Sequence, residues 1–431
     1  MANINQHRIA VGSICTAVLV STLAAHAAAL PPDPNNAALL YYQALLRRPE
    51  PDDAAKILVY DATREQIYKL LLGGEFETDD LYWSYDDPTD PAEKLDDINP
   101  NEKIREYLKE CKETIEYAEA AGRLSQSNWG FWYSQGYGPG TEVMMQWESL
   151  MRVLSVDALI LAADKDYRAA LERCLTIRQL ARHIPHDTEF CYMKSVDADG
   201  RALRAIRHIL GITRLDVDTL TWLKTQLASK SAMPQSPVRM MKMNLELMLQ
   251  TIRTDDKGLA WLRVQLALKN LQDMIVKKDI RHLSEDDLLA RIGKPYAEFL
   301  DSAVETIQSD LPYEYKYGKL QKLVDTFQKE AKGNPTIIRS MEISAGAMLG
   351  SYYYHLRHAA DFNALRTAIE IYLVRAKTGR LPDTLPAGSL KDPYSDKAFE
   401  YERTKEGFVL RCRVKEIALG KAQQYEFKVQ E

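Results

Sequence analysis

The sequence lacks the short motifs by which many enzymes are recognised. It contains no G-x-S-x-G segment, no phosphate-binding P-loop, no dinucleotide fingerprint and no cysteine pairs at zinc-ribbon spacing. Long runs of lysine and arginine are also missing, and the formal net charge of −5 gives no general attraction to nucleic acid or anionic membranes. We therefore expect no nucleic-acid partner, and the sequence implies no cofactor.

Cysteine is scarce, with only five residues in a chain of 431. Cys15 lies in the apolar N-terminal run, and the four others are Cys111, Cys174, Cys191 and Cys412. Four cysteines allow three pairings, of which a Cys174–Cys191 disulfide could bridge two successive helices. The alternative is that all four are small apolar core residues, because a chain of this length does not need disulfides to fold.

The N-terminus has the three parts of a secretory signal peptide. Arg8 supplies a positive charge, residues 9–25 form an apolar stretch, and alanines at cleavage spacing follow, either in residues 25–27 or in residues 27–29. A retained membrane anchor is the alternative, but the stretch is shorter than the roughly 20 apolar residues that span a bilayer and is interrupted by Gly12 and Ser13. We predict that residues 1–29 are removed, that the mature chain has no transmembrane segment, and that it is exported to the periplasm or beyond.

Apolar residues recur at helical spacing over most of the remaining chain. Residues 142–163 and 167–183 are predicted to form a helical hairpin, and residues 336–377 one long helix that Gly379 ends as a C-terminal cap. Further helices are predicted at 36–46, 62–72, 104–121, 197–210, 216–227, 237–252, 259–276, 295–309 and 313–332, with a short one capped at Ser284.

After Gly379 the spacing of apolar residues changes to that of strands. Phe399 and Tyr401 alternate with polar residues, as do residues 408–414 and 425–429, which predicts a small antiparallel β-meander. The expected fold class is mainly α, an irregular multi-helix stack or bundle with a long C-terminal helix and this meander. Its parts are a signal peptide (1–29), a helical domain (30–335) and a long helix with a small β-subdomain (336–431).

Three segments of the chain resemble an uncharacterised family of exported bacterial all-helical proteins. They are WGFWYSQGYGPGTEVMMQWESLMRVLSVDALILA (129–162), DYRAALERCLTIRQLARHI (166–184) and RALRAIRHIL (201–210) with the helix that follows it, and the C-terminal tail also fits. The resemblance implies a helical packing pattern and assigns no catalytic residue.

The C-terminal tail resembles the C-terminal part of the major pseudopilin of type II secretion. There a long helix ends at a Gly-Arg-x-Pro turn, here Gly379, Arg380 and Pro382, and an Asp-Pro loop, here Asp392 and Pro393, leads into a small sheet. The resemblance implies the fold of the tail. Pseudopilins begin with a methylated apolar helix, whereas here residues 1–335 precede the long helix, so the resemblance does not extend to filament assembly.

Two groups of residues are candidates for a metal ion. His183 and His186, with Glu189 and Cys191 nearby, offer ligand types that zinc prefers, although Pro185 interrupts regular helix between them. A polar connection between helices is the alternative.

In the pseudopilin-like loop, Asp392 and Asp396 could coordinate calcium, as this loop does in some pseudopilins. Two carboxylates are fewer than the six to eight oxygens that calcium takes, and turn-forming aspartates are the alternative.

Aromatic residues gather in two predicted loops, one beside acidic residues. The first loop contributes Trp83 and Tyr85 next to Asp86, with Tyr82 and Asp87, and the second contributes Trp129, Trp132 and Tyr133, with Phe131 and Tyr137. Exposed rings could stack on a sugar or peptide, and Asp86 with a second carboxylate could cleave a glycosidic bond. The alternative is that the rings fill the end of a helical stack.

The long helix carries His355 and His358, which can share one face, whereas Asp361 is rotated away by the helical period. Such a face can bind a ligand or supply acid–base groups, or it can be a packing stripe. For the whole chain we favour a non-catalytic helical protein of the cell envelope that binds an envelope protein or a glycan, or supports an assembly. An exported hydrolase, acting on glycans through the aromatic and acidic loops, is the alternative.

Overall fold

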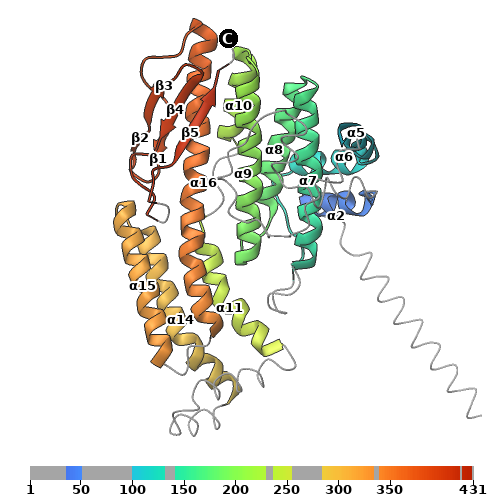
Figure 1. The fold of residues 1–431 in the computed structure, drawn as a ribbon. Coiled ribbons are helices and arrows are strands. Elements are labelled where there is room, and N and C mark those ends of the chain that lie inside the picture. Colours follow the sequence, from blue (N-terminus) through green and yellow to red (C-terminus); the bar gives the residue numbers. More distant parts are fainter. Residues whose placement is uncertain are drawn as a thin grey trace, which may run out of the picture.

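The computed structural model describes residues 35–50, 100–131, 141–229, 236–254, 284–333, 339–417 and 420–429. Within these ranges lie eleven helices and five short strands, and the predicted fold class is confirmed: the chain is mainly helical, with a long C-terminal helix and small antiparallel sheets near the C-terminus (Figure 1). The predicted helices at 62–72 and 259–276 lie outside the described residues.

The predicted hairpin forms as α7 (Thr141–Ala163) and α8 (Tyr167–His183), and α9 (Glu189–Ile212) packs beside α8. Asp166 starts α8 because its side chain accepts a hydrogen bond from the Ala169 amide. The helices before the hairpin are α2 (Ala37–Arg47), α5 (Pro100–Glu110) and α6 (Lys112–Gly122), and those after α9 are α10 (Val217–Ser229), α11 (Val238–Thr254), α14 (Glu285–Gln308) and α15 (Tyr313–Gly333).

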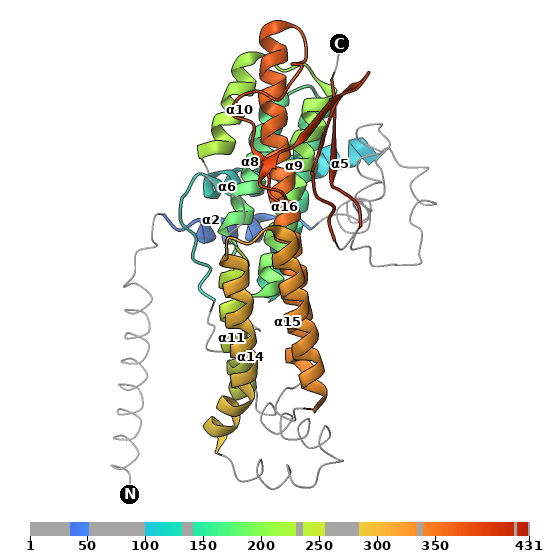
Figure 2. The same ribbon diagram turned by 90° about the vertical axis from the view of Figure 1, so that its left-hand side faces the viewer.

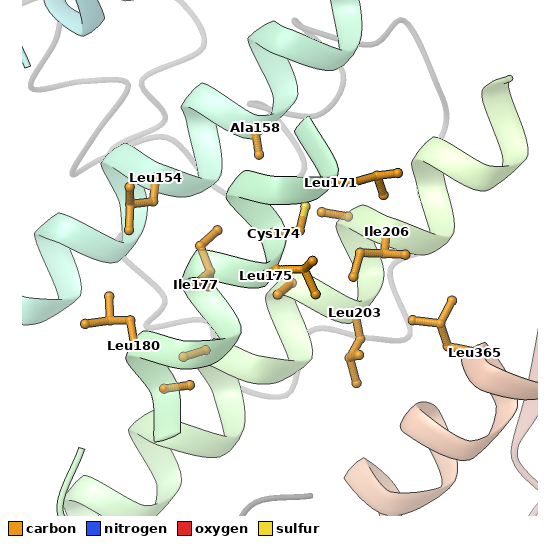
Figure 3. Packing of buried hydrophobic residues seen from close by; sticks show 14 of the residues in the cluster. Leu154, Ala158, Leu171, Cys174, Leu175, Ile177, Leu180, Leu203, Ile206 and Leu365 are labelled. Atoms are coloured by element: carbon orange, nitrogen blue, oxygen red, sulfur yellow. The ribbon is translucent and has the colours of Figure 1, made fainter. Parts of the chain in front are cut away.

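The core of the hairpin is apolar because leucine, isoleucine and alanine recur at helical spacing on the facing sides of α7, α8 and α9. Figure 3 shows these side chains meeting around Cys174, with Leu365 approaching from the long C-terminal helix. The labelled residues of this cluster are almost completely buried: Leu154, Ala158, Leu171, Cys174, Leu175, Ile177, Leu180, Leu203, Ile206 and Leu365.

The long helix α16 (Arg339–Thr378) runs through the whole molecule and joins its two halves (Figures 1 and 2). Its first half packs with α15 and shares hydrophobic clusters with α14, and its second half packs with α9, α10 and the C-terminal sheet. Buried alanines such as Ala360, Ala364 and Ala368 let the second half approach its neighbours closely. None of the described helices is both long and apolar enough to cross a membrane.

The predicted meander is β3 (Glu400–Arg403), β4 (Gly407–Arg411) and β5 (Gln424–Lys428), joined in that order as antiparallel neighbours. Before it, β1 (Lys391–Asp392) pairs with β2 (Lys397–Ala398) in a second small sheet. Phe408 and Phe427 lie opposite each other in register and stack with ring centroids 5.0 Å apart. Tyr372 of α16 packs on Phe408 and donates a hydrogen bond to the Lys428 carbonyl, so the sheet is fixed to the long helix.

Three predicted helix boundaries are wrong: a missed break at Cys111, a start placed at residue 197, and a break expected at Pro295. The helix expected at 104–121 is divided at Cys111, whose ψ of 3° leaves the helical range. The helix expected from 197 begins at Glu189, because the Thr188 side chain caps it by accepting from the Cys191 amide.

The helices expected to meet at Pro295 are one helix, α14, with Pro295 inside it. Ile292 before the proline and Tyr296 after it are both fully buried in one cluster with residues of α11 and α15, and this packing outweighs the lost backbone hydrogen bond.

Candidate functional site

Three ionisable side chains meet in the core between α8, α9 and α16. Arg178 donates from Nε and Nη2 to the two carboxylate oxygens of Asp199, at 2.5 and 3.0 Å, and His358 donates from Nε2 to Asp199 Oδ2 at 2.9 Å. The exposed fractions are 2% for Arg178, 1% for Asp199 and 3% for His358. Both oxygens of the carboxylate are therefore occupied by groups from two other helices. We call these three residues the central network.

The electrostatic balance of the central network keeps Asp199 ionised. Burial by itself raises the pKa of this carboxyl, but the neighbouring Arg178 and His358 outweigh it and hold the pKa well below its usual range. The guanidinium of Arg178 also lies 4.6 Å from the ring centroid of Phe362, one turn after His358 on α16. The long helix therefore contacts the ion pair through both an imidazole and an aromatic ring.

Arg178 and Asp199 were not anticipated from the sequence. The signal for both is a charged residue on a helix stripe that is otherwise apolar. Arg178 follows Cys174 by one turn on the buried face of α8, and Asp199 stands between the buried residues Ala198 and Gly200 on α9. His358, the second partner of Asp199, lies far along the chain, so the sequence pattern alone does not connect the three.

Arg182 lies one helical turn after Arg178 and is only half-buried as a residue. Its Nε and Nη2 atoms are nevertheless shielded from solvent, and they make no hydrogen bond in the structure. Burial, together with repulsion from Arg178, lowers the pKa of Arg182 to about 10, with Asp199 acting in the opposite direction. The guanidinium is thus still protonated at neutral pH.

His355 and Asp361 lie on different sides of α16, as the helical period predicts. Burial and the neighbouring His358 lower the pKa of His355 to about 4, so its imidazole is neutral at pH 7. Asp361 instead faces the C-terminal sheet, where burial and then this carboxylate raise the pKa of Tyr425. Of the sequence candidates on this helix, only His358 is brought to a carboxylate, and that carboxylate is Asp199 rather than Asp361.

Trp129 from the second aromatic loop is 4% exposed and packs against α2 and the end of α8. Its Nε1 donates to the His183 carbonyl at 2.6 Å, and its ring stacks on Tyr41 with centroids 5.5 Å apart and planes at 4°. The His183 ring hydrogen-bonds with the Tyr41 hydroxyl through Nδ1, at 2.8 Å. The Trp129 ring is buried in these contacts within the protein, so it offers no exposed face on which a sugar could stack.

The metal candidates His183 and His186 have separate partners. His186 Nε2 hydrogen-bonds with the Ser195 hydroxyl at 2.7 Å, and burial lowers the pKa of His186 to about 4. Across the described ranges, no group of three or more His, Cys, Asp or Glu side chains is placed to hold a metal ion. These residues form the polar connection between α8 and α9 that the alternative interpretation describes.

The calcium candidates Asp392 and Asp396 also have separate partners. Asp392 is buried and accepts from the amides of Tyr394 and Arg413, both at 2.9 Å, so it organises the loop. Asp396 is exposed and pairs with Lys391 at 3.0 Å. The first carboxylate is committed to the backbone and the second to a surface ion pair.

The Cys174–Cys191 disulfide considered from the sequence is not formed. All four cysteines of the described chain are free and buried, and burial raises the pKa of the Cys174 thiol to about 12. Because α8 and α9 pack with Arg178 opposite Asp199, Cys174 and Cys191 lie about three helical turns apart along the hairpin. The thiols serve as small apolar core groups.

The other predicted site residues lie outside the described residues: Trp83, Tyr85, Asp86, Trp132 and Tyr133. Comparison of the chain with protein-family models, with curated proteins and with solved structures finds no match. The function is therefore argued from the central network and its surroundings.

We expect the free energy of unfolding to fall as the pH drops from 7 toward 4. His186 and His355 have pKa values of about 4 in the folded protein, whereas an unfolded imidazole protonates near 6.5. The unfolded chain binds more protons between these values, so acid favours it, by roughly 2–3 kcal/mol per histidine at pH 4. Urea denaturation at pH 7, 6 and 5 measures the slope. His355→Gln should make the slope shallower, and an unchanged slope contradicts burial of a neutral imidazole there.

Proposed function

We propose that the protein is an exported, non-catalytic helical protein of the cell envelope that binds a partner or supports an assembly. The observation that carries this proposal is the burial and mutual saturation of the central network. A histidine next to an aspartate is typical of acid–base catalysis, which requires the imidazole to reach a substrate. Here His358 is 3% exposed and its carboxylate partner is shared with Arg178.

The central network instead connects three helices. His358 is one of the contacts that hold α16 to the α8–α9 hairpin, and α16 also packs against the C-terminal sheet and α15. Buried ion pairs add little net stability over apolar packing, but a wrongly placed helix would leave a buried charge unpaired. The network therefore selects one position of the long helix, which suits a protein whose role is to present a fixed shape.

The exported-hydrolase alternative draws less support from the described residues. Its platform requires exposed rings, whereas Trp129 is buried and hydrogen-bonded to the His183 carbonyl. Export itself is supported by the apolar stretch at residues 9–25 and the small residues that follow it.

The proposal is tested by isolating the protein from the cell envelope. We expect the mature chain to begin at Ala28 or Leu30, and to run on a native gel as part of a complex larger than the monomer. Recovery of an intact chain beginning at Met1 from the membrane fraction contradicts cleavage, and a monomer in every fraction contradicts a binding role.

The purified mature protein is then incubated with envelope glycan, and released reducing ends are measured. We expect the same background from the natural protein and from His358→Gln, in which an amide replaces the imidazole. Turnover above background by the natural protein contradicts the proposal, and turnover that His358→Gln retains supports a hydrolase acting through the aromatic and acidic loops.

A further inference from the structure

Arg178 and Arg182 are one turn apart on α8, so their side chains project from the same side of the helix. Arg178 uses the edge of its guanidinium formed by Nε and Nη2 to hold both oxygens of Asp199. The same two atoms of Arg182 are buried and make no hydrogen bond in the described structure. We call this edge of a guanidinium, formed by Nε and Nη2, its fork. The helix therefore presents two forks of the same kind, and only the fork of Arg178 is paired with a carboxylate.

An empty fork of this kind is unusual because buried guanidinium groups are normally paired and hydrogen-bonded. Asp199, the carboxylate whose charge acts on Arg182, has both oxygens committed to Arg178 and His358. The charge around the fork is in positive excess, since two guanidiniums share one carboxylate. His355 on α16 is neutral at pH 7 and so adds no charge of its own.

The two arginines differ in exposure. Arg178 is 2% exposed as a residue. Arg182, near the end of α8, is half-buried as a residue, but its Nε and Nη2 atoms are themselves covered, so a ligand carboxylate must displace the groups that cover them. A ligand that reaches Arg182 replaces the lost hydration of the guanidinium with two charge-assisted hydrogen bonds.

We propose that Arg182 is the receptor for the carboxylate group of a bound ligand, held side-on through Nε and Nη2 in the way Arg178 holds Asp199. This inference rests on the proposed binding function and names the chemical class that its site takes. A planar group with two oxygens matches the fork, and a single negative charge offsets the one unpaired guanidinium. Sulfate, which is tetrahedral and doubly charged, matches both features less well.

The test uses acetate as the probe, with the full mature chain at pH 7.5 and chloride at equal ionic strength as the reference. A ligand that binds only the folded state raises the melting temperature with its concentration. We expect an acetate-specific rise for the natural protein, and its loss in Arg182→Met, which keeps a long side chain but removes the fork. Arg182→Lys keeps the charge without the fork and should weaken acetate binding at least tenfold.

A matched control is Arg168→Met on the same helix. Arg168 is a surface residue that pairs with Glu172 and lies over the ring of Trp222, so its loss should leave the acetate-specific rise unchanged. The part of the rise that Arg182→Met removes should be larger for acetate than for sulfate, which separates binding at the fork from general salt effects.

Three results overturn the inference: no acetate-specific rise in the natural protein, an equal rise in Arg182→Met, or a larger Arg182-dependent rise with sulfate. If Arg182→Met does not fold, the Nε–H nuclear magnetic resonance signal of Arg182 in the natural protein decides, because it should shift as acetate is added. These outcomes leave the glycan and native-gel experiments unaffected, so a failed Arg182 site is distinguishable from a failed binding function.

Discussion

Replacement of Asp199 by Ala is expected to lower the free energy of unfolding by about 3–5 kcal/mol, because it leaves the buried guanidinium of Arg178 without its counter-ion. The same change removes the acceptor of His358 and so detaches α16 from the α8–α9 hairpin at this point. Urea denaturation at pH 7, followed by circular dichroism, measures the loss.

The control for this variant is Asp197→Ala, two residues earlier on α9. The Asp197 side chain is 40% exposed and pairs with Arg201 at 2.6 Å on the surface, where ion pairs contribute about 1 kcal/mol or less. A loss for Asp199→Ala no greater than that for Asp197→Ala contradicts the role assigned to the central network.

Replacement of Trp129 by Ala is expected to cost about 3–5 kcal/mol, the range for deleting a packed aromatic side chain. The change removes the stacking on Tyr41 and leaves the His183 carbonyl without its indole donor. A thermal melt detects the loss as a clear fall in melting temperature. If the ring were an exposed sugar platform, stability would change by no more than about 0.5 kcal/mol.

The matched aromatic control is Tyr315→Ala on α15. Tyr315 is 69% exposed, so its removal should alter stability by about 0.5 kcal/mol or less. Equal and small effects for Trp129→Ala and Tyr315→Ala contradict the packing role of Trp129.

The helices that could be predicted from the sequence are those whose signals are local. The bounds of α8 agree with the prediction because Asp166 caps its start and an apolar stripe runs along it to His183. The meander could likewise be predicted from the alternation around Phe408 and Phe427, which lie on one face of the sheet. Each of these signals depends on neighbours within a few residues.

Features that depend on distant parts of the chain could not be predicted. The spacing of apolar residues does not show that α14 remains helical across Pro295 because it packs against α11 and α15. The sequence pattern correctly separates His358 from Asp361 around the helix, yet it gives no sign that the partner is Asp199, which lies 159 positions away. For the same reason Trp129 could be interpreted either as a core ring or as a binding platform until its contact with Tyr41 was seen.

The central claim is that Arg178 and Asp199 act as a structural pair, and a double-mutant cycle tests it most directly. The variants are Arg178→Met, Asp199→Leu and the two together, each compared by urea denaturation. Replacing both members of a buried ion pair by apolar groups often leaves the free energy of unfolding nearly unchanged. Removing only one member leaves the other charge buried without a partner, at the full cost of its desolvation. We predict that the double variant is more stable than Asp199→Leu alone. A double variant whose loss equals the sum of the two single losses contradicts the claim.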